Sequence, residues 1–146
     1  MFGPLPIPHV TATAGQFPHN VTFRQADWVA NEIPEDAALY DVVLALSISK
    51  WIHLNNGDDG LLRFLRRVYS VLKPGGKFVL EPQEWDTYAK AKRMDSRLKE
   101  TGNNLKLRPA DFERLLLDIG FETVEHLGMI GVGGFRRPLE LYTKTN

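Results

Sequence analysis

Two apolar segments separated by one amphipathic segment restrict this chain to an α/β architecture. Residues 40–46 (YDVVLAL) form a continuous apolar run after one acid, a pattern typical of a buried strand in a parallel sheet. In residues 58–73, apolar side chains recur at helical spacing and basic side chains take the opposite face, which predicts an amphipathic helix. Two acids mark its start, and a Lys-Pro-Gly-Gly sequence marks its end. Residues 77–82 (KFVLEP) predict a second strand, which Pro82 stops.

The rest of the chain continues this alternation of strands and helices. Pro109 favours the first turn of a helix that Gly120 closes, and residues 121–127 and 138–143 predict two later, hairpin-like strands. A short β-prone segment, Val21–Phe23, precedes the first strong strand. Residues 1–20 hold four of the nine prolines and no charged residue, so they are expected to form an extended arm, with residues 21–146 forming the domain.

Composition limits the possible functions. With 18 basic and 18 acidic residues the chain has no net charge, and its lack of cysteine excludes disulfides, a cysteine nucleophile and thiolate metal sites. The isolated positions of His9, His19 and His126 argue against a metal site, and no apolar run has the roughly 20 residues needed to cross a membrane. Residues 86–108 carry seven bases and three acids, which fits either a solvated surface or an anion-binding surface.

Two motifs resemble the class I S-adenosylmethionine-dependent methyltransferases. Residues 40–46 are similar to the fourth strand of that fold, and residues 72–80 (LKPGGKFVL) are similar to the turn into the fifth strand. The segments that follow, residues 46–55 (LSISKWIHLN) and 80–85 (LEPQEW), together with residues 134–138 (GFRRP), closely resemble the methylphosphate capping enzymes of the bicoid-interacting-protein type. This resemblance runs from about Phe17 to Lys144.

The resemblance implies methyl transfer from S-adenosylmethionine to the 5′-terminal phosphate of RNA, with small nuclear RNA as the best-known substrate. It also implies a nuclear location, with the cytoplasm as the alternative, and a possible ribonucleoprotein partner. Neither a membrane nor a metal is expected to take part. A phosphate oxygen is already anionic, so alignment and charge management are expected to carry the catalysis rather than a strong base.

Side chains near the carboxyl ends of the two predicted strands are the candidates for this chemistry, because a ligand lies at those ends in open α/β sheets. The expected catalytic residues are Lys50, His53 and Gln83, and the expected RNA or phosphate ligands are Trp85, Arg108, Arg136 and Arg137. His53 is equally able to order its loop, and one arginine of the last pair is expected to be only solvated. Trp51 and Phe135 offer further rings for stacking, although Trp51 fits the core at least as well.

Four residues are expected to contact the cofactor. Leu46 ends the first strong strand and Ser47 follows it, and the resemblance gives Asp27 a contact with the adenine amine and Trp28 a place beside the ring. The sequence Ala26-Asp27-Trp28 departs from the Gly-Asn-Tyr-like pattern of the family, so a surface turn is the competing interpretation.

The first strand and glycine-rich loop of the methyltransferase fold have no counterpart in the sequence. Residues 131–134 (GVGG) do not open a helix, and we expect them to form a loop over the site instead. The expected fold is therefore a partial Rossmann-like sheet, strands 3 to 7 of the usual seven with flanking helices, in which the fourth strand has a bare apolar edge. Weak cofactor binding is expected. The alternatives are a catalytically silent RNA-binding scaffold and, less favoured, a small-molecule methyltransferase.

Overall fold

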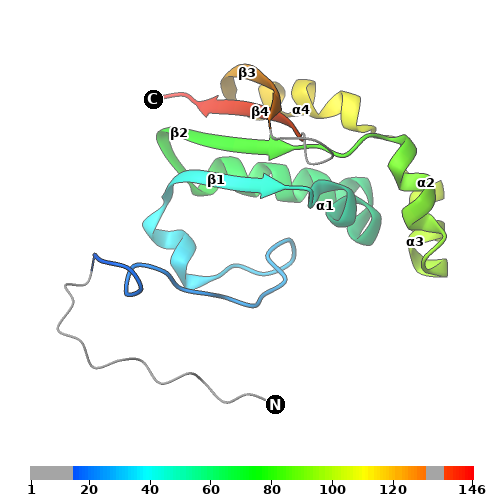
Figure 1. The fold of residues 1–146 in the computed structure, drawn as a ribbon, viewed down its shortest axis with the longest axis horizontal. Coiled ribbons are helices and arrows are strands. Elements are labelled where there is room, and N and C mark those ends of the chain that lie inside the picture. The colour runs from blue at the N-terminus through cyan, green and yellow to red at the C-terminus, as the bar shows by residue number, and fades with distance from the viewer. Residues whose placement is uncertain (1–14, 131–136) are drawn as a thin grey trace, which may run out of the picture.

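A mixed four-stranded sheet organises the protein. The structure, a computed structural model, describes residues 15–130 and 137–146. The strands are β1 (Tyr40–Leu46), β2 (Leu72–Glu81), β3 (Phe121–Ile130) and β4 (Arg137–Lys144). They lie in the order β1-β2-β4-β3 (Figure 1), with β1 and β2 parallel and β4 antiparallel to both β2 and β3. The strands predicted within residues 40–46, 77–82, 121–127 and 138–143 are confirmed.

Two helices cover one face of the sheet and two more lie beyond its end. Helix α1 (Ser49–Val71) connects β1 to β2, and α4 (Phe112–Ile119) follows a short 3-10 turn, η2 (Pro109–Asp111). Both lie on the same face of the sheet, while α2 (Asp86–Lys92) and α3 (Ser96–Asn103) lie beyond the carboxyl ends of β1 and β2 (Figure 1). A 3-10 turn, η1 (Pro34–Ala38), precedes β1.

Helix α1 is longer than the sequence predicts. It begins at Ser49, and its backbone breaks at Gly57, where φ is 72° and ψ is −174°. Asp58 therefore opens the second of two helical segments, which is the position that the acidic pair predicts. The first segment carries no acid in its first turn, so the usual charge signal for a helix start is missing there.

The expected turn before the second strand is a bulge within β2. Tyr40 pairs with Leu72 and Val42 with Lys77, so the intervening Pro74-Gly75-Gly76 has no paired partner across the ladder. Gly75 has a φ of 78°, a conformation that glycine adopts without strain.

The hydrophobic core lies between the sheet and the two helices that cover it. Alternate residues of β1, β2 and β4 point into it, including Ala45, Phe78 and Tyr142, where they meet the apolar stripe of α1 and Phe112 and Leu116 of α4. A second, smaller cluster joins α1 to α2 and α3 and contains Leu54, Tyr88, Ala91, Leu98 and Leu105. Trp51, a possible core residue by sequence, belongs to neither cluster and is 36% exposed.

The opposite face of β1 is apolar and about half exposed. Val42, Leu44 and Leu46 are 50%, 62% and 43% exposed, and β1 has one paired strand among the residues that the structure describes. The bare apolar edge expected from the sequence is therefore present. Residues 21–27 contain no strand, so the expectation of a strand at Val21–Phe23 is wrong. A strand needs a hydrogen-bonded neighbour, and this segment has none in the sheet.

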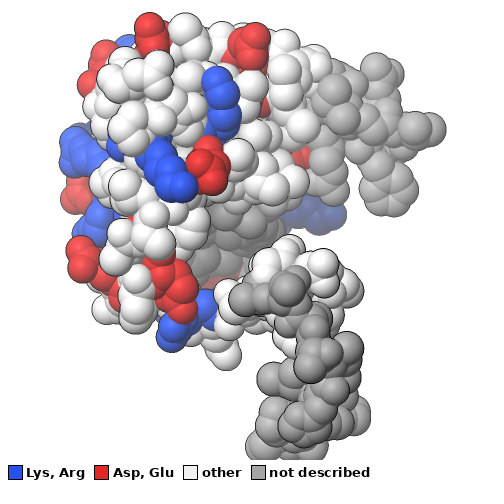
Figure 2. Space-filling model, turned by 90° about the vertical axis from the view of Figure 1, so that its left-hand side faces the viewer, with Lys and Arg blue, Asp and Glu red and all other residues white. Residues whose placement is uncertain are grey.

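The amino ends of β1 and β2 lie on the face shown in Figure 2, where acidic and basic side chains are intermingled. In the described residues, no helix is long and apolar enough to span a membrane, and no group of three potential metal ligands occurs. The expected glycine loop at residues 131–134, Phe135, Arg136 and most of the proline-rich arm lie outside the described residues.

Candidate functional site

The side chain of Gln83 joins the carboxyl ends of the two parallel strands. Its Oε1 atom accepts hydrogen bonds from the Ser49 hydroxyl and from the backbone amide of Lys50, each at 3.1 Å. Gln83 follows β2, while Ser49 and Lys50 form the first turn of α1. The carboxamide carbonyl faces these donors, which leaves the amide NH2 to donate to a ligand.

A second contact also joins the end of β2 to the turn between β1 and α1. The Ser47 hydroxyl donates to the carboxylate of Glu81, the last residue of β2, and Glu81 is buried. Ser47 itself has a φ of 56°, a left-handed conformation that few residues other than glycine and asparagine adopt without cost. The turn from β1 into α1 is therefore held in one shape by Glu81, at the end of β2, and by Gln83, just after it.

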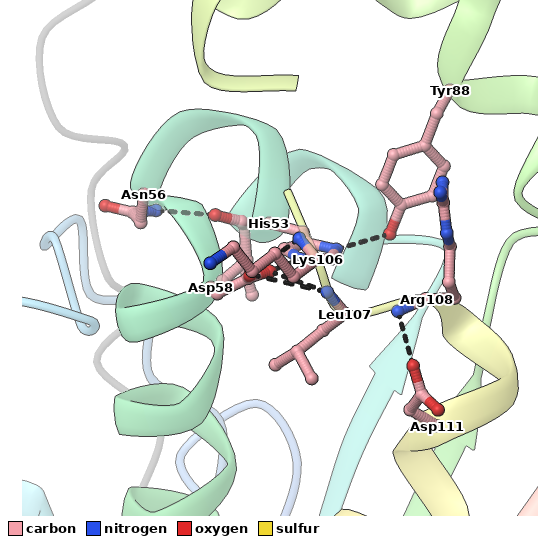
Figure 3. A network of polar contacts seen from close by, with 9 residues as sticks. His53, Asn56, Asp58, Tyr88, Lys106, Leu107, Arg108 and Asp111 are labelled. Carbon is pink, nitrogen blue, oxygen red and sulfur yellow. Dashed lines mark hydrogen bonds and ion pairs between the residues drawn. The ribbon is translucent and has the colours of Figure 1, made fainter. Parts of the chain in front are cut away.

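His53 lies one helical turn after Ser49 and is fully buried. Its Nδ1 atom is 2.9 Å from the Tyr88 hydroxyl, and its Nε2 atom is 2.7 Å from the Asp58 carboxylate. Asp58 also accepts hydrogen bonds from the backbone amides of Lys106 and Leu107, as Figure 3 shows. This set of contacts, here called the His53 network, ties α1 to α2 and to the loop that precedes η2.

The protonation states in this network follow from its surroundings. Burial lowers the pKa of His53 more than its contact with Asp58 raises it, which favours the neutral ring. Burial acts to raise the pKa of Asp58, but the hydrogen bonds from His53 and the two amides outweigh it and keep that pKa below its usual value. Burial raises the pKa of Tyr88, so the phenol stays protonated. Tyr88 therefore donates to Nδ1, and the Nε2 proton is donated to Asp58.

The loop held by the His53 network carries Arg108, which stacks on Trp85. The Arg108 guanidinium carbon is 3.7 Å from the Trp85 ring centroid, and the Trp85 and Tyr88 rings are 4.7 Å apart. Arg108 is exposed and Trp85 is half-buried. A guanidinium stacked in this way keeps its N–H groups in the plane above the ring, where they are able to bind an anion.

The structure thus brings five predicted site residues to one end of the sheet: Lys50, His53, Gln83, Trp85 and Arg108. Leu46 and Ser47 lie at the same end, at the end of β1. The backbone of Arg137 also begins β4 at this end, because β4 runs antiparallel to β2 and pairs Glu140 with Leu80.

Asp27 and Trp28 lie in the segment that precedes η1. An Asp27 carboxylate oxygen accepts the amide of Ala30 at 3.2 Å, and the Trp28 indole donates to Asp36 at 2.8 Å. The Trp28 ring packs edge-on against Phe64 on α1, and it also lines a hollow with Leu44 and Ile48. The adenine contact and the surface turn both stay predictions.

The sequence analysis did not identify two members of the His53 network, Asp58 and Tyr88. Asp58 predicts only a helix start, and Tyr88 carries no motif of its own. The one available signal is Gly57, because a glycine in the middle of a helical pattern marks a break where a polar side chain is free to turn towards another segment.

The fold is similar to that of a solved S-adenosylmethionine-dependent methyltransferase. The solved methyltransferase SibL superposes on 84% of this chain and 35% of its own with a TM-score of 0.50, at 19% sequence identity.

The family follows from the sequence profile of the Bicoid-interacting protein 3 (Bin3) family, which matches residues 40–144. The chain belongs to this family. It is 38% identical to the human 7SK snRNA methylphosphate capping enzyme over 97% of this chain and 22% of that protein. It is 36% identical to the Drosophila melanogaster U6 snRNA methylphosphate capping enzyme Amus over 92% of this chain and 47% of that protein. The chain is 35% identical to a rat (Rattus norvegicus) RNA 5′-monophosphate methyltransferase over 60% of this chain and 32% of that protein. The chain thus spans less than half the length of these relatives.

The fold and the family imply dependence on S-adenosylmethionine. Ser47, one of the predicted cofactor contacts, bonds Glu81. Neither strand-to-helix connection at the carboxyl ends of β1 and β2 contains a glycine. The cofactor contacts of Leu46 and Ser47 stay predictions.

Proposed function

We propose that this chain forms the RNA-binding side of an active site that methylates the 5′-terminal phosphate of a nuclear RNA. The printed names of its relatives, which act on 7SK and U6 small nuclear RNA or on RNA 5′-monophosphate, support this class of substrate. The observation that carries the proposal is the contact of Gln83 with Ser49 and Lys50, because it fixes two polar ligands from different elements at the carboxyl ends of the parallel strands.

The chemistry needs orientation more than proton transfer. A terminal phosphate carries about −1.5 to −2 charges at pH 7, so its oxygen is already a nucleophile. The Lys50 ammonium, the Arg108 guanidinium and the Gln83 NH2 group would hold the other phosphate oxygens, and the methyl group would come from S-adenosylmethionine when it is bound. His53 holds Arg108 and Trp85 in place through Asp58 and Tyr88, so we assign it a positioning role rather than contact with the substrate.

Transfer of a labelled methyl group tests this proposal. The full chain is incubated with S-adenosylmethionine at high concentration and with RNA that ends in a 5′-phosphate or a 5′-hydroxyl. We expect transfer only to the phosphorylated RNA, and calorimetry should give weak cofactor binding. The Gln83→Ala variant should lose about 10-fold or more of this transfer, the scale of a lost oriented donor. Equal labelling of both RNAs would contradict the proposal.

A second function has its own support. Helices α2 and α3 present exposed basic residues at the same end of the sheet, and the connections that follow β1 and β2 there contain no glycine. These features suit an RNA-binding scaffold without catalysis. Salt-sensitive RNA binding with no methyl transfer, even at saturating S-adenosylmethionine, would favour this function over the first.

A further inference from the structure

A groove of about 500 Å³ lies between the first turn of α1 and the face of α2, directly beside the candidate site. Its lining residues are Lys50, Trp51, Asp86, Thr87, Lys90, Ala91 and Met94. The α2 side contributes residues four positions apart along about two helical turns, so the groove extends away from Lys50 along the helix.

Large apolar surfaces border this groove. Trp51 is 36% exposed and Met94 is 70% exposed, and neither belongs to a core cluster. Both are bulky and polarisable, and the Trp51 ring lies beside the Lys50 ammonium. An aromatic ring in a basic groove is the usual platform for a nucleobase, since every base has a flat face to stack.

The charges of the groove are positive on balance. The Lys50 ammonium lies 4.8 Å from the Trp51 ring centroid, and Lys90 lies in the last turn of α2. Asp86 is the one acid of the lining, at the first turn of α2. Because the Lys50 backbone also bonds Gln83, the groove and the candidate phosphate ligands share a residue.

We propose that this groove binds the first nucleotides of single-stranded RNA, with a base stacked on Trp51 and backbone phosphates paired with Lys50 and Lys90. This deepens the proposed function and rests on it for the position of the 5′ end. The alternation of ring and ammonium groups favours RNA over an apolar protein segment, which would have to desolvate both lysines. An acidic peptide is the competing occupant.

The test measures binding of RNA to the full chain by fluorescence anisotropy. Oligonucleotides of about eight nucleotides, a length within the usual single-strand site sizes, carry either a 5′-hydroxyl or a 5′-phosphate. Trp51→Ala should weaken binding of both RNAs about 10-fold, the loss expected for one base stack, whereas Trp51→Phe should retain most of it. Lys90→Ala should lower the slope of log affinity against log salt by about 0.7. Circular dichroism confirms that each variant is folded.

Lys73→Ala is the matched control, because Lys73 is a half-exposed lysine at the opposite end of β2. It should leave binding unchanged. If folded Trp51→Ala and Lys90→Ala bind the 5′-hydroxyl RNA as the parent chain does, the groove proposal is overturned. It is also overturned if a glutamate peptide of equal length binds the groove more tightly than RNA. A failure of the proposed function shows separately, as no preference for the 5′-phosphate and no methyl transfer.

Discussion

The ring of His53 joins three segments that are far apart in the sequence. Through Tyr88 it holds α2, and through Asp58 it holds the amides of Lys106 and Leu107, next to Arg108. The position of the Arg108 guanidinium over Trp85 therefore depends on hydrogen bonds made by the buried His53 and Tyr88 and by the partly buried Asp58. Changes at these residues should affect stability and RNA binding together.

Asp58→Asn tests this dependence. The substitution removes the anionic acceptor and places an NH2 group near two backbone N–H donors, so we expect unfolding in urea to cost about 2 kcal/mol less. Binding of 5′-phosphorylated RNA should weaken as well. Asp59→Asn, the same change at the exposed neighbouring residue, should stay within about 0.5 kcal/mol. Equal effects of the two variants would argue against the network.

The same residues predict how stability depends on pH. Burial lowers the pKa of His53 in the folded chain, whereas the unfolded ring titrates near its ordinary value of about 6.5. Between these two values the unfolded chain binds more protons, so the free energy of unfolding should fall as the pH is lowered from about 7 to 5. The lowered pKa of Asp58 extends this loss to more acidic conditions. Urea titrations at several pH values measure it.

His126 supplies the control for this pH dependence. It is exposed, and its contact with Glu113 raises its pKa, so it stabilises the fold as the pH falls. His126→Gln should therefore make the loss of stability on acidification steeper than in the parent chain. A shallower loss in this variant would mean that the sign assigned to one of the two histidines is wrong.

At the scale of an element, the break in α1 sets where its first segment points. Gly57 turns the chain so that the segment from Ser49 to Asn56 faces the carboxyl ends of the strands, and the segment from Asp58 onwards packs on the sheet. A Cβ atom at Gly57 would meet only Thr101 Cγ2, at 3.9 Å, which is an ordinary contact. The requirement for glycine is therefore conformational rather than steric.

Gly57→Ala should destabilise the chain by about 1–3 kcal/mol, the cost of a non-glycine residue in this backbone region. Thermal unfolding followed by circular dichroism measures it. Gly15→Ala is the control, because Gly15 has open space around it and its φ lies outside the left-handed region. That variant should be neutral or slightly more stable. Unchanged stability of Gly57→Ala would show that α1 straightens at no cost.

The elements themselves were largely predictable, because their signals are local. Apolar runs and helical spacing predicted all four strands of the described sheet and the body of α1, and the proline and glycine at either end predicted one helix where the structure has η2 followed by α4. The His53 network was not predictable, because its partners are far apart in the sequence. His53 and Tyr88 are separated by 35 residues, and Asp58 and Lys106 by 48. The predicted strand at Val21–Phe23 was wrong although its signal is local. The segment has β propensity, but no described strand pairs with it.

For the whole molecule, the main consequence of the fold is the open side of β1. Leu44, at 62% exposure, lies in the middle of an apolar face, on a strand whose outer edge pairs with no other strand among residues 15–130 and 137–146. Such an edge pairs readily with another chain. We therefore expect the protein to self-associate as its concentration rises in sedimentation experiments.

Leu44→Lys should suppress this association, because a lysine on an edge strand cannot be buried against a second sheet. Leu117→Lys is the matched control: Leu117 is also an exposed leucine, 39% accessible, but lies on α4 and away from the edge. It should leave the association unchanged. If both lysine variants behave like the parent chain, the edge of β1 is not the contact.

The order β1-β2-β4-β3 also predicts how fast the backbone amides of each strand exchange with deuterium. β2 has a partner on each side, so over its central residues the N–H groups on both sides of the strand are bonded and exchange with deuterium only when the sheet opens. β1 has one partner, so every second amide faces outwards and exchanges quickly. Hydrogen exchange along β1 should therefore alternate residue by residue. A strand paired with the outer edge of β1 would instead protect the amides along its whole length.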